Sequence, residues 1–180
     1  MARIPYSDTD QANTELKQAM GPRPPLNVVR MIAHAEPSTI GFLSLGGALL
    51  GRNNDLKSQL RELVIIRVGI LCGSEYEVFQ HKRLAKKVGI SDDKVAALDN
   101  GPLAAAFDDL ERKVLCYTDA VVRDVKADAA TFEAVADLLS HRAMVELTLT
   151  IGFYMMVSRI LENFEVELEN DAGKPTQVED

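Results

Sequence analysis

The fold is decided by residues 61–89, which read RELVIIRVGILCGSEYEVFQHKRLAKKVG. From about Leu56 to Leu71 the chain is apolar most of the way round a helix, so this helix is predicted to be central. Gly73 and Ser74 mark a break, after which a second helix runs to Val88 and is ended by Gly89. Two helices joined by so short a break are expected to form a hairpin.

The rest of the chain also has helical periodicity, and no stretch alternates apolar and polar residues as a strand does. Pro37 is predicted to stop one of these helices and Ser38 to cap the next. The last helix is predicted to bury Leu147, Ile151, Met155, Ile160 and Phe164. The predicted further helices cover about residues 8–20, 27–35, 38–50, a short one from 91, 110–122, 131–139 and 141–168.

Composition narrows the class of protein. The chain has 180 residues, of which 47% are apolar, which suits one globular domain. We expect a lead at 1–24, a helical domain at 25–168 and an acidic tail at 169–180. The formal net charge is −7, of which residues 165–180 carry −5, so the acidity says little about a site and a nucleic-acid partner is not expected.

No membrane span is expected, because no run of 18 uncharged apolar residues occurs. The N-terminus lacks an apolar segment of signal-peptide length. Cys72 and Cys116 do not make a disulfide framework. These features predict a cytoplasmic protein.

Four side chains in the hairpin are candidates for chemistry. Glu77 and His81 are four residues apart, so they share a helix face, and Ser74 adjoins it. Glu62 lies in the apolar helix, where a carboxylate needs a partner or a changed protonation state. Arg67, His81 and Ser74 are its candidate partners. If Glu62 meets His81 across the hairpin, the two form a proton relay.

Structural interpretations of the same residues remain open. Ser74 and Glu77 match a helix capping box. His81 on an apolar face is compatible with a satisfied core residue, and Glu62 with Arg67 is compatible with a structural ion pair. No metal site is predicted, because the three histidines are spread over 108 residues.

The pattern of Arg61, Glu62 and Arg67, followed by Ser74, Tyr76, Glu77 and His81, resembles the carboxymuconolactone decarboxylase family. The resemblance covers about residues 25–168. It implies an all-α, alkylhydroperoxidase D-like multi-helix bundle that assembles as homo-oligomers, often trimers or hexamers. It also implies roles for the residues of the motif: catalysis by Glu62, Glu77 and His81, and substrate binding by Arg67, Ser74 and Tyr76.

The related alkylhydroperoxidase D branch carries a Cys-x-x-Cys pair in this motif. Here Ser74 and Glu77 stand at the two thiol positions, with the spacing from Glu62 and to His81 preserved. Cys72 lies two residues before the first thiol position, and Cys116 is far away in the sequence. A thiol peroxidase needs a reactive thiolate and a resolving thiol, and this chain has no vicinal pair.

The resemblance therefore favours a cofactor-free lyase or isomerase acting on a small anionic cyclic compound, with His81 as acid and base. The namesake decarboxylases carry a Tyr-x-Gly-x-Pro-like segment that this chain lacks, so another substrate is expected. Two alternatives stay open. One is a peroxidase-like antioxidant protein that uses Cys72 or Cys116 with an external thiol, and the other is a non-catalytic oligomeric binding protein.

Overall fold

The computed structural model describes residues 1–169; the remainder of the predicted acidic tail lies outside the described residues. Within that part of the chain all regular structure is helical, so the all-α prediction is confirmed. The α-helices are α1 (Thr14–Met20), α2 (Asn27–Ile32), α3 (Glu36–Leu49), α4 (Ser58–Cys72), α5 (Glu75–Lys87), α6 (Asp92–Ala97), α7 (Asp109–Asp124), α8 (Ala129–Ala136) and α9 (His141–Phe164), with short 3-10 helices at Thr9–Gln11, Ala33–Ala35 and Leu98–Asn100.

Helix α4 is the centre of the bundle, and it packs against α5, α7 and α9. All residues from Leu60 to Gly69 are buried, as the apolar pattern predicts. Its two sides face different core clusters: Val64 and Ile65 belong to the larger one with α9, whereas Leu63 and Ile66 pack with α5, α6 and α7. Burial on both sides explains why the apolar residues surround the helix instead of forming one stripe.

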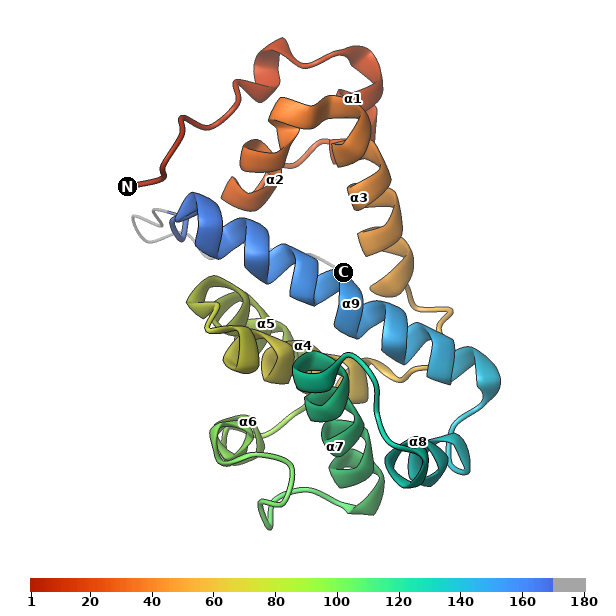
Figure 1. Cartoon of the computed structure of the whole chain (residues 1–180). Helices are drawn as coiled ribbons and strands as arrows, with labels where there is room; N and C mark the ends of the chain where they lie inside the picture. The colour runs from red at the N-terminus through yellow and green to blue at the C-terminus, as the bar shows by residue number, and fades with distance from the viewer. Residues whose placement is uncertain (170–180) are drawn as a thin grey trace.

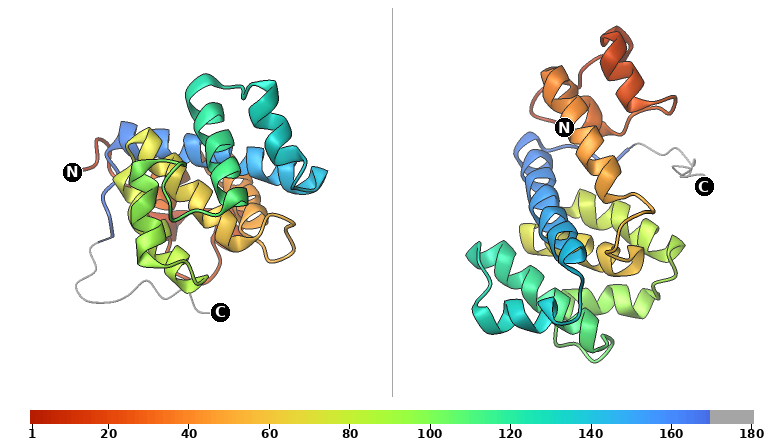
Figure 2. Two further views of the ribbon diagram at one scale, coloured as in Figure 1. Left: turned by 90° about the horizontal axis from the view of Figure 1, so that it is seen from below. Right: turned by 90° about the vertical axis from the view of Figure 1, so that its right-hand side faces the viewer.

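Helix α9 runs between the two parts of the molecule (Figure 1). Helices α1, α2 and α3 lie on one side of it, and α4, α5 and α7 lie on the other. The right-hand view of Figure 2 shows the same division, with the N-terminal helices at one end. Among residues 1–169, α9 is the one helix long and apolar enough to cross a membrane, and half of its most apolar window is buried inside the protein. A core helix of this kind passes the same test of length and composition.

Two details of the N-terminal helices differ from the sequence prediction. Helix α3 already begins at Glu36, with Pro37 in its first turn, and no side chain caps it. Proline is tolerated there because the first N–H groups of a helix have no intrahelical partner. The predictions that Pro37 stops a helix and that Ser38 caps the next are therefore wrong.

Helix α9 ends earlier than predicted, at Phe164, because Glu165 adopts a left-handed conformation. Leu147 and Ile151 are buried as predicted, but Met155 and Ile160 are only half-buried and Phe164 is exposed. Tyr154 and Leu161 fill the buried face instead.

Candidate active site

Helices α4 and α5 form the predicted hairpin, and Gly73 makes the turn with a positive φ of 68°. The two helices approach closely at Gly69, where a Cβ atom would lie 3.0 Å from Val78 Cγ2 and 3.3 Å from Glu77 Cβ. A larger side chain at position 69 would push α5 away. Gly69 thus sets the spacing that brings Glu77 against α4.

The hairpin brings Glu62 and His81 together. His81 Nδ1 lies 2.6 Å from Glu62 Oε2, and the two residues are 6% and 1% exposed. An ionised carboxylate only accepts hydrogen bonds, so Nδ1 is the donor in this pair. Glu62 therefore orients the imidazole and stabilises its positive charge when Nε2 is also protonated.

The second imidazole nitrogen faces Glu77. His81 Nε2 lies 3.5 Å from Glu77 Oε2, one turn earlier on the same helix. Burial raises the pKa of Glu77 from 4.5 to about 7, with the positive charge on His81 lowering it and the carboxylate of Glu62 raising it. The imidazole thus lies between two carboxyl groups. One of them, Glu77, keeps its own proton up to the neutral pH range.

Ser74 occupies the N-cap position of α5, but its side chain does not cap the helix. Its hydroxyl oxygen and Glu77 Oε2 are both buried and have no hydrogen-bond partner among the described residues. The capping-box interpretation is therefore wrong. Two buried oxygens without a hydrogen-bond partner at the start of one helix are unusual in a native protein.

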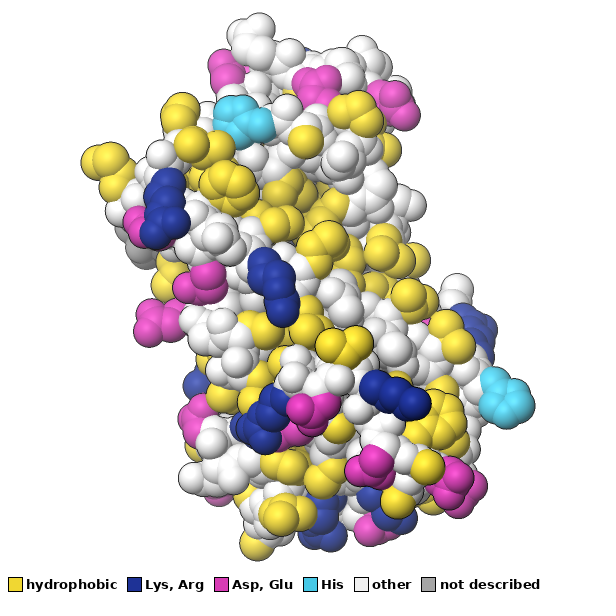
Figure 3. All heavy atoms as spheres, in the orientation of Figure 1, with side chains coloured by type: hydrophobic (Ala, Val, Ile, Leu, Met, Phe, Trp, Pro, Cys, Tyr) yellow, Lys and Arg dark blue, Asp and Glu magenta, His cyan; other side chains and the backbone are white. Residues whose placement is uncertain are grey.

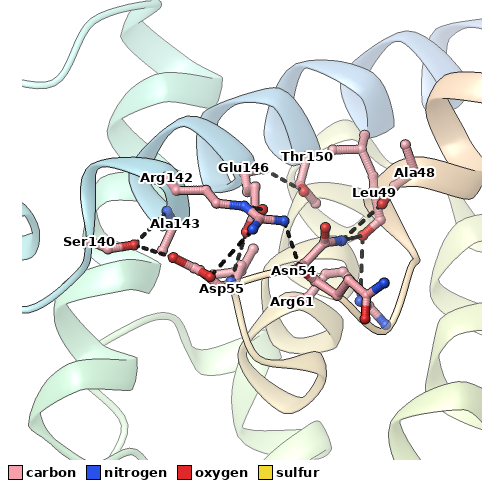
Figure 4. Close-up of polar contacts among 12 residues, drawn as sticks. Ala48, Leu49, Asn54, Asp55, Arg61, Ser140, Arg142, Ala143, Glu146 and Thr150 are labelled. Atoms are coloured by element: carbon pink, nitrogen blue, oxygen red, sulfur yellow. Dashed lines mark hydrogen bonds and ion pairs between the residues drawn. The ribbon is translucent and has the colours of Figure 1, made fainter.

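The site also contains two residues that the sequence analysis did not select. Arg61 is 7% exposed, and its Nε lies 3.3 Å from Glu62 Oε1. Its NH1 group donates to the Leu49 carbonyl at 3.4 Å, and Asn54 donates to the same carbonyl (Figure 4). The sequence does contain a signal for Arg61, because a charged residue beside Glu62 at the start of an apolar helix needs a buried partner.

Tyr154 is the second residue, and it comes from α9. Its ring meets the His81 ring edge to face, with the centroids 4.9 Å apart. Burial raises the pKa of the Tyr154 phenol well above its ordinary value, and the nearby Glu77 and Glu62 carboxylates raise it further. The phenol therefore stays neutral. Nothing local in the sequence links Tyr154 to the hairpin, because the contact depends on how α9 packs.

Arg67 and Tyr76 make their side-chain hydrogen bonds with partners other than Glu62, Glu77 and His81. Arg67 Nε and NH2 donate to the two carboxylate oxygens of Asp119 at 2.7 and 2.6 Å, and NH1 donates to the Leu98 carbonyl. The guanidinium is fully engaged there, and it does not pair with Glu62. We therefore do not include Arg67 in the site. The Tyr76 hydroxyl donates to Glu169 near the C-terminal end of the described chain.

Among residues 1–169, no group of three or more His, Cys, Asp or Glu side chains is placed to hold a metal ion. Cys72 and Cys116 are both free. Burial raises the pKa of the Cys116 thiol, as does the nearby Asp119 carboxylate. A raised pKa reduces the thiolate fraction, which is the reactive form.

Two apolar grooves lie on the surface beside α9, and neither is lined by Glu62, Glu77 or His81. They have volumes of about 750 and 470 Å³ and share Leu45, Phe153 and Met156. Figure 3 shows apolar side chains gathered on this face, between the N-terminal helices and the rest of the bundle. The buried carboxyl–imidazole group is thus separate from the two grooves.

Residues 40–120 match the carboxymuconolactone decarboxylase family, and they include the whole α4–α5 hairpin. The matched region covers slightly less than half of the chain. Glu62, Ser74, Glu77 and His81 all lie within the matched region. No curated protein sequence matches the chain.

Solved structures show that the fold is alkylhydroperoxidase D-like. An uncharacterised peroxidase-related protein from Ralstonia eutropha, described as an alkylhydroperoxidase AhpD core, is 15% identical with a TM-score of 0.83, over 94% of this chain and 93% of that chain. A peroxidase-related protein from Silicibacter sp. is 17% identical with a TM-score of 0.73, over 81% and 77%. The debrominase Bmp8 in complex with 2,3,4-tribromopyrrole is 17% identical with a TM-score of 0.74, over 94% and 91%.

Proposed function

We propose that this protein is a cofactor-free lyase or isomerase that acts on a small anionic cyclic compound. The observation that carries the proposal is the buried His81 imidazole between the Glu62 and Glu77 carboxyl groups. Perturbed carboxylic acids beside a histidine are typical of proton-transfer sites. The buried oxygens of Ser74 and Glu77 support it further, since neither has a hydrogen-bond partner among the described residues.

In this proposal each residue has a separate role. Glu62 accepts the Nδ1–H of His81 and stabilises the imidazolium. Glu77, with a pKa of about 7, delivers a proton to substrate carbon; the His81 imidazolium then gives its Nε2 proton to Glu77, and solvent reprotonates the imidazole before the next turnover. In a decarboxylation, the electrons of the broken carbon–carbon bond enter a conjugated carbonyl, carbon dioxide leaves, and the relay supplies one proton. In an isomerisation, the proton removed at one carbon returns at another.

The substrate class rests on size and charge. Arg61, and not Arg67, is the arginine that contacts this group, so it is the cation that offsets an anionic intermediate. One solved structure with the same fold is a debrominase bound to a brominated pyrrole, which is a small ring compound. This likeness supports a small cyclic substrate for the present chain.

The test is proton exchange with solvent. The protein is incubated in D2O with a panel of unsaturated lactones and cyclic carboxylic acids, and NMR follows deuterium uptake and carbon dioxide release. His81→Gln should abolish turnover of any compound that the wild type converts. His141→Gln is the matched control, because His141 is exposed on α9, and it should retain full activity. Wild-type rates in a folded His81→Gln variant would contradict the proposal.

The peroxidase alternative has weaker support in the structure. Cys72 ends α4, whereas Cys116 lies within α7 and has a raised pKa. Neither cysteine stands at the positions of Ser74 and Glu77, and no cysteine contact with the imidazole occurs among the hydrogen bonds of the described residues. The peroxidase-related descriptions of the neighbours apply to those proteins.

We also propose that the chain forms homo-oligomers, trimers or hexamers, through a second copy docked on the groove face of α9. Val145, Leu149 and Met156 on this face are 59%, 47% and 42% exposed. An apolar patch of this kind is typical of an interaction surface. The family resemblance supports a second copy of this chain as the partner that binds this face.

A cytoplasmic location stays a prediction.

A further inference from the structure

Residues 166–169, here called the strap, turn back from the end of α9 and lie against α2 and α5. Val166 is buried in the main core. The Glu167 N–H donates to the Tyr6 hydroxyl, and Asn27 Nδ2 donates to the Glu167 carbonyl, each at 3.0 Å. The strap is therefore held by one apolar contact and by polar contacts at its outer end.

The strap places the Glu169 carboxylate among three hydrogen-bond donors. Oε1 accepts from the Asn27 backbone N–H at 2.8 Å and from the Tyr76 hydroxyl. Oε2 accepts from Gln80 Nε2 at 2.6 Å. The donors come from two helices far apart in the sequence, and both carboxylate oxygens are satisfied. Asn27, Tyr76 and Gln80, here called the cradle, thus have the donor set of a carboxylate-binding site.

The cradle adjoins the buried proton-transfer group. Tyr76 precedes Glu77 and Gln80 precedes His81, so the two cradle side chains share a neighbouring face of α5. Burial and the hydrogen bond to Glu169 raise the pKa of the Tyr76 phenol, so it remains a donor. Glu77 and His81 are only 4% and 6% exposed. A molecule that reaches them must displace part of the protein, and the strap contacts Tyr76 and Gln80, the residues that precede them on α5.

We infer that the cradle is a binding site for the carboxylate of a ligand, and that Glu169 occupies it in this closed state as an intramolecular substitute. A ligand carboxylate and Glu169 then compete for the same donors. The tethered carboxylate has a high effective concentration, so it weakens the apparent affinity for a free carboxylate. Binding at the cradle is measured without turnover. A failure to bind the carboxylate would leave the proposed function intact, and a failure of turnover would leave the cradle intact.

The probe is benzoate, with benzamide as its uncharged counterpart. Binding is followed by NMR on the Asn27 backbone amide and the Gln80 side-chain amide of the full chain, because both groups donate to the carboxylate. Glu169→Ala should bind benzoate about tenfold more tightly than the wild type, with the Asn27 signal shifting in both. Glu162→Ala removes the same charge from an exposed position near the end of α9, and it should match the wild type.

Adding Tyr76→Phe to Glu169→Ala should weaken benzoate binding about tenfold, and benzamide should not shift the Asn27 signal in any variant. If that double variant does not fold, as judged by circular dichroism and its melting temperature, Gln80→Leu in the Glu169→Ala background replaces it with the same expectation. Equal benzoate affinity in the wild type and Glu169→Ala would overturn the inference. Benzoate shifts confined to amides outside the cradle would overturn it as well.

Discussion

The buried Glu77 makes stability depend on pH in a direction opposite to that of most acids. Its pKa rises from 4.5 in the unfolded chain to about 7 in the folded protein. The folded state therefore binds the proton more tightly than the unfolded chain. The stabilisation that protonated Glu77 contributes is fully present below pH 4.5, and it is lost as the pH rises through 7. Between pH 5 and pH 8 this single group should lower the free energy of unfolding by about 2.5 kcal/mol, since one pKa unit corresponds to about 1.4 kcal/mol.

Urea unfolding at pH 5, 6, 7 and 8 measures this effect. Glu77→Gln mimics the protonated acid. Between pH 5 and pH 8 its free energy of unfolding should therefore not show the loss of about 2.5 kcal/mol that is expected for the wild type. Glu75→Gln is the control, because Glu75 is exposed on the same helix, and it should follow the wild type. Parallel pH profiles for wild type and Glu77→Gln would show that Glu77 is ionised in the folded protein at pH 5, and the assignment of Glu77 as proton donor would then fail.

Three further predictions concern other parts of the molecule. Asp119→Ala leaves the Arg67 guanidinium buried and unpaired, so urea unfolding should show a loss of about 3–5 kcal/mol; a loss under 1 kcal/mol would mean that water reaches the pair. Replacing Cys72 and Cys116 by serine should leave any hydroperoxide reduction unchanged, and abolished reduction in a coupled peroxidase assay would restore the thiol alternative. Leu149→Glu places a charge on the exposed groove face, so light scattering should find smaller assemblies than for the wild type; an unchanged mass would refute this face as the interface.

The hairpin could be predicted from the sequence because local signals agree there. An apolar run, a glycine break and a Glu–His pair at helical spacing all lie within 29 residues. Such patterns depend on neighbours along the chain. The contact between Glu62 and His81 needed one further assumption, namely that the two helices fold back on each other. Gly69 allows that close approach, although the sequence analysis did not single it out.

The remaining features depend on packing between distant segments. The partner of Arg67 is Asp119, which lies 52 residues away on α7. Tyr154 reaches His81 only because α9 crosses α4. At Ser74 the local motif predicted a contact that does not form. The sequence fits a capping box, but the buried Ser74 hydroxyl does not cap the helix. A local motif states which hydrogen bonds can form, and the surrounding burial decides whether they do.

Burial links the closed state of the site to its chemistry. The pKa of Glu77 is near 7 because the carboxyl group is removed from water. If release of the strap admitted water, that pKa would fall toward its ordinary value, and Glu77 would lose its proton at neutral pH. A donor is therefore available only while the site is sealed. A ligand that replaces Glu169 in the cradle and excludes water itself would keep Glu77 protonated, so binding and readiness for proton transfer would be set by the same event.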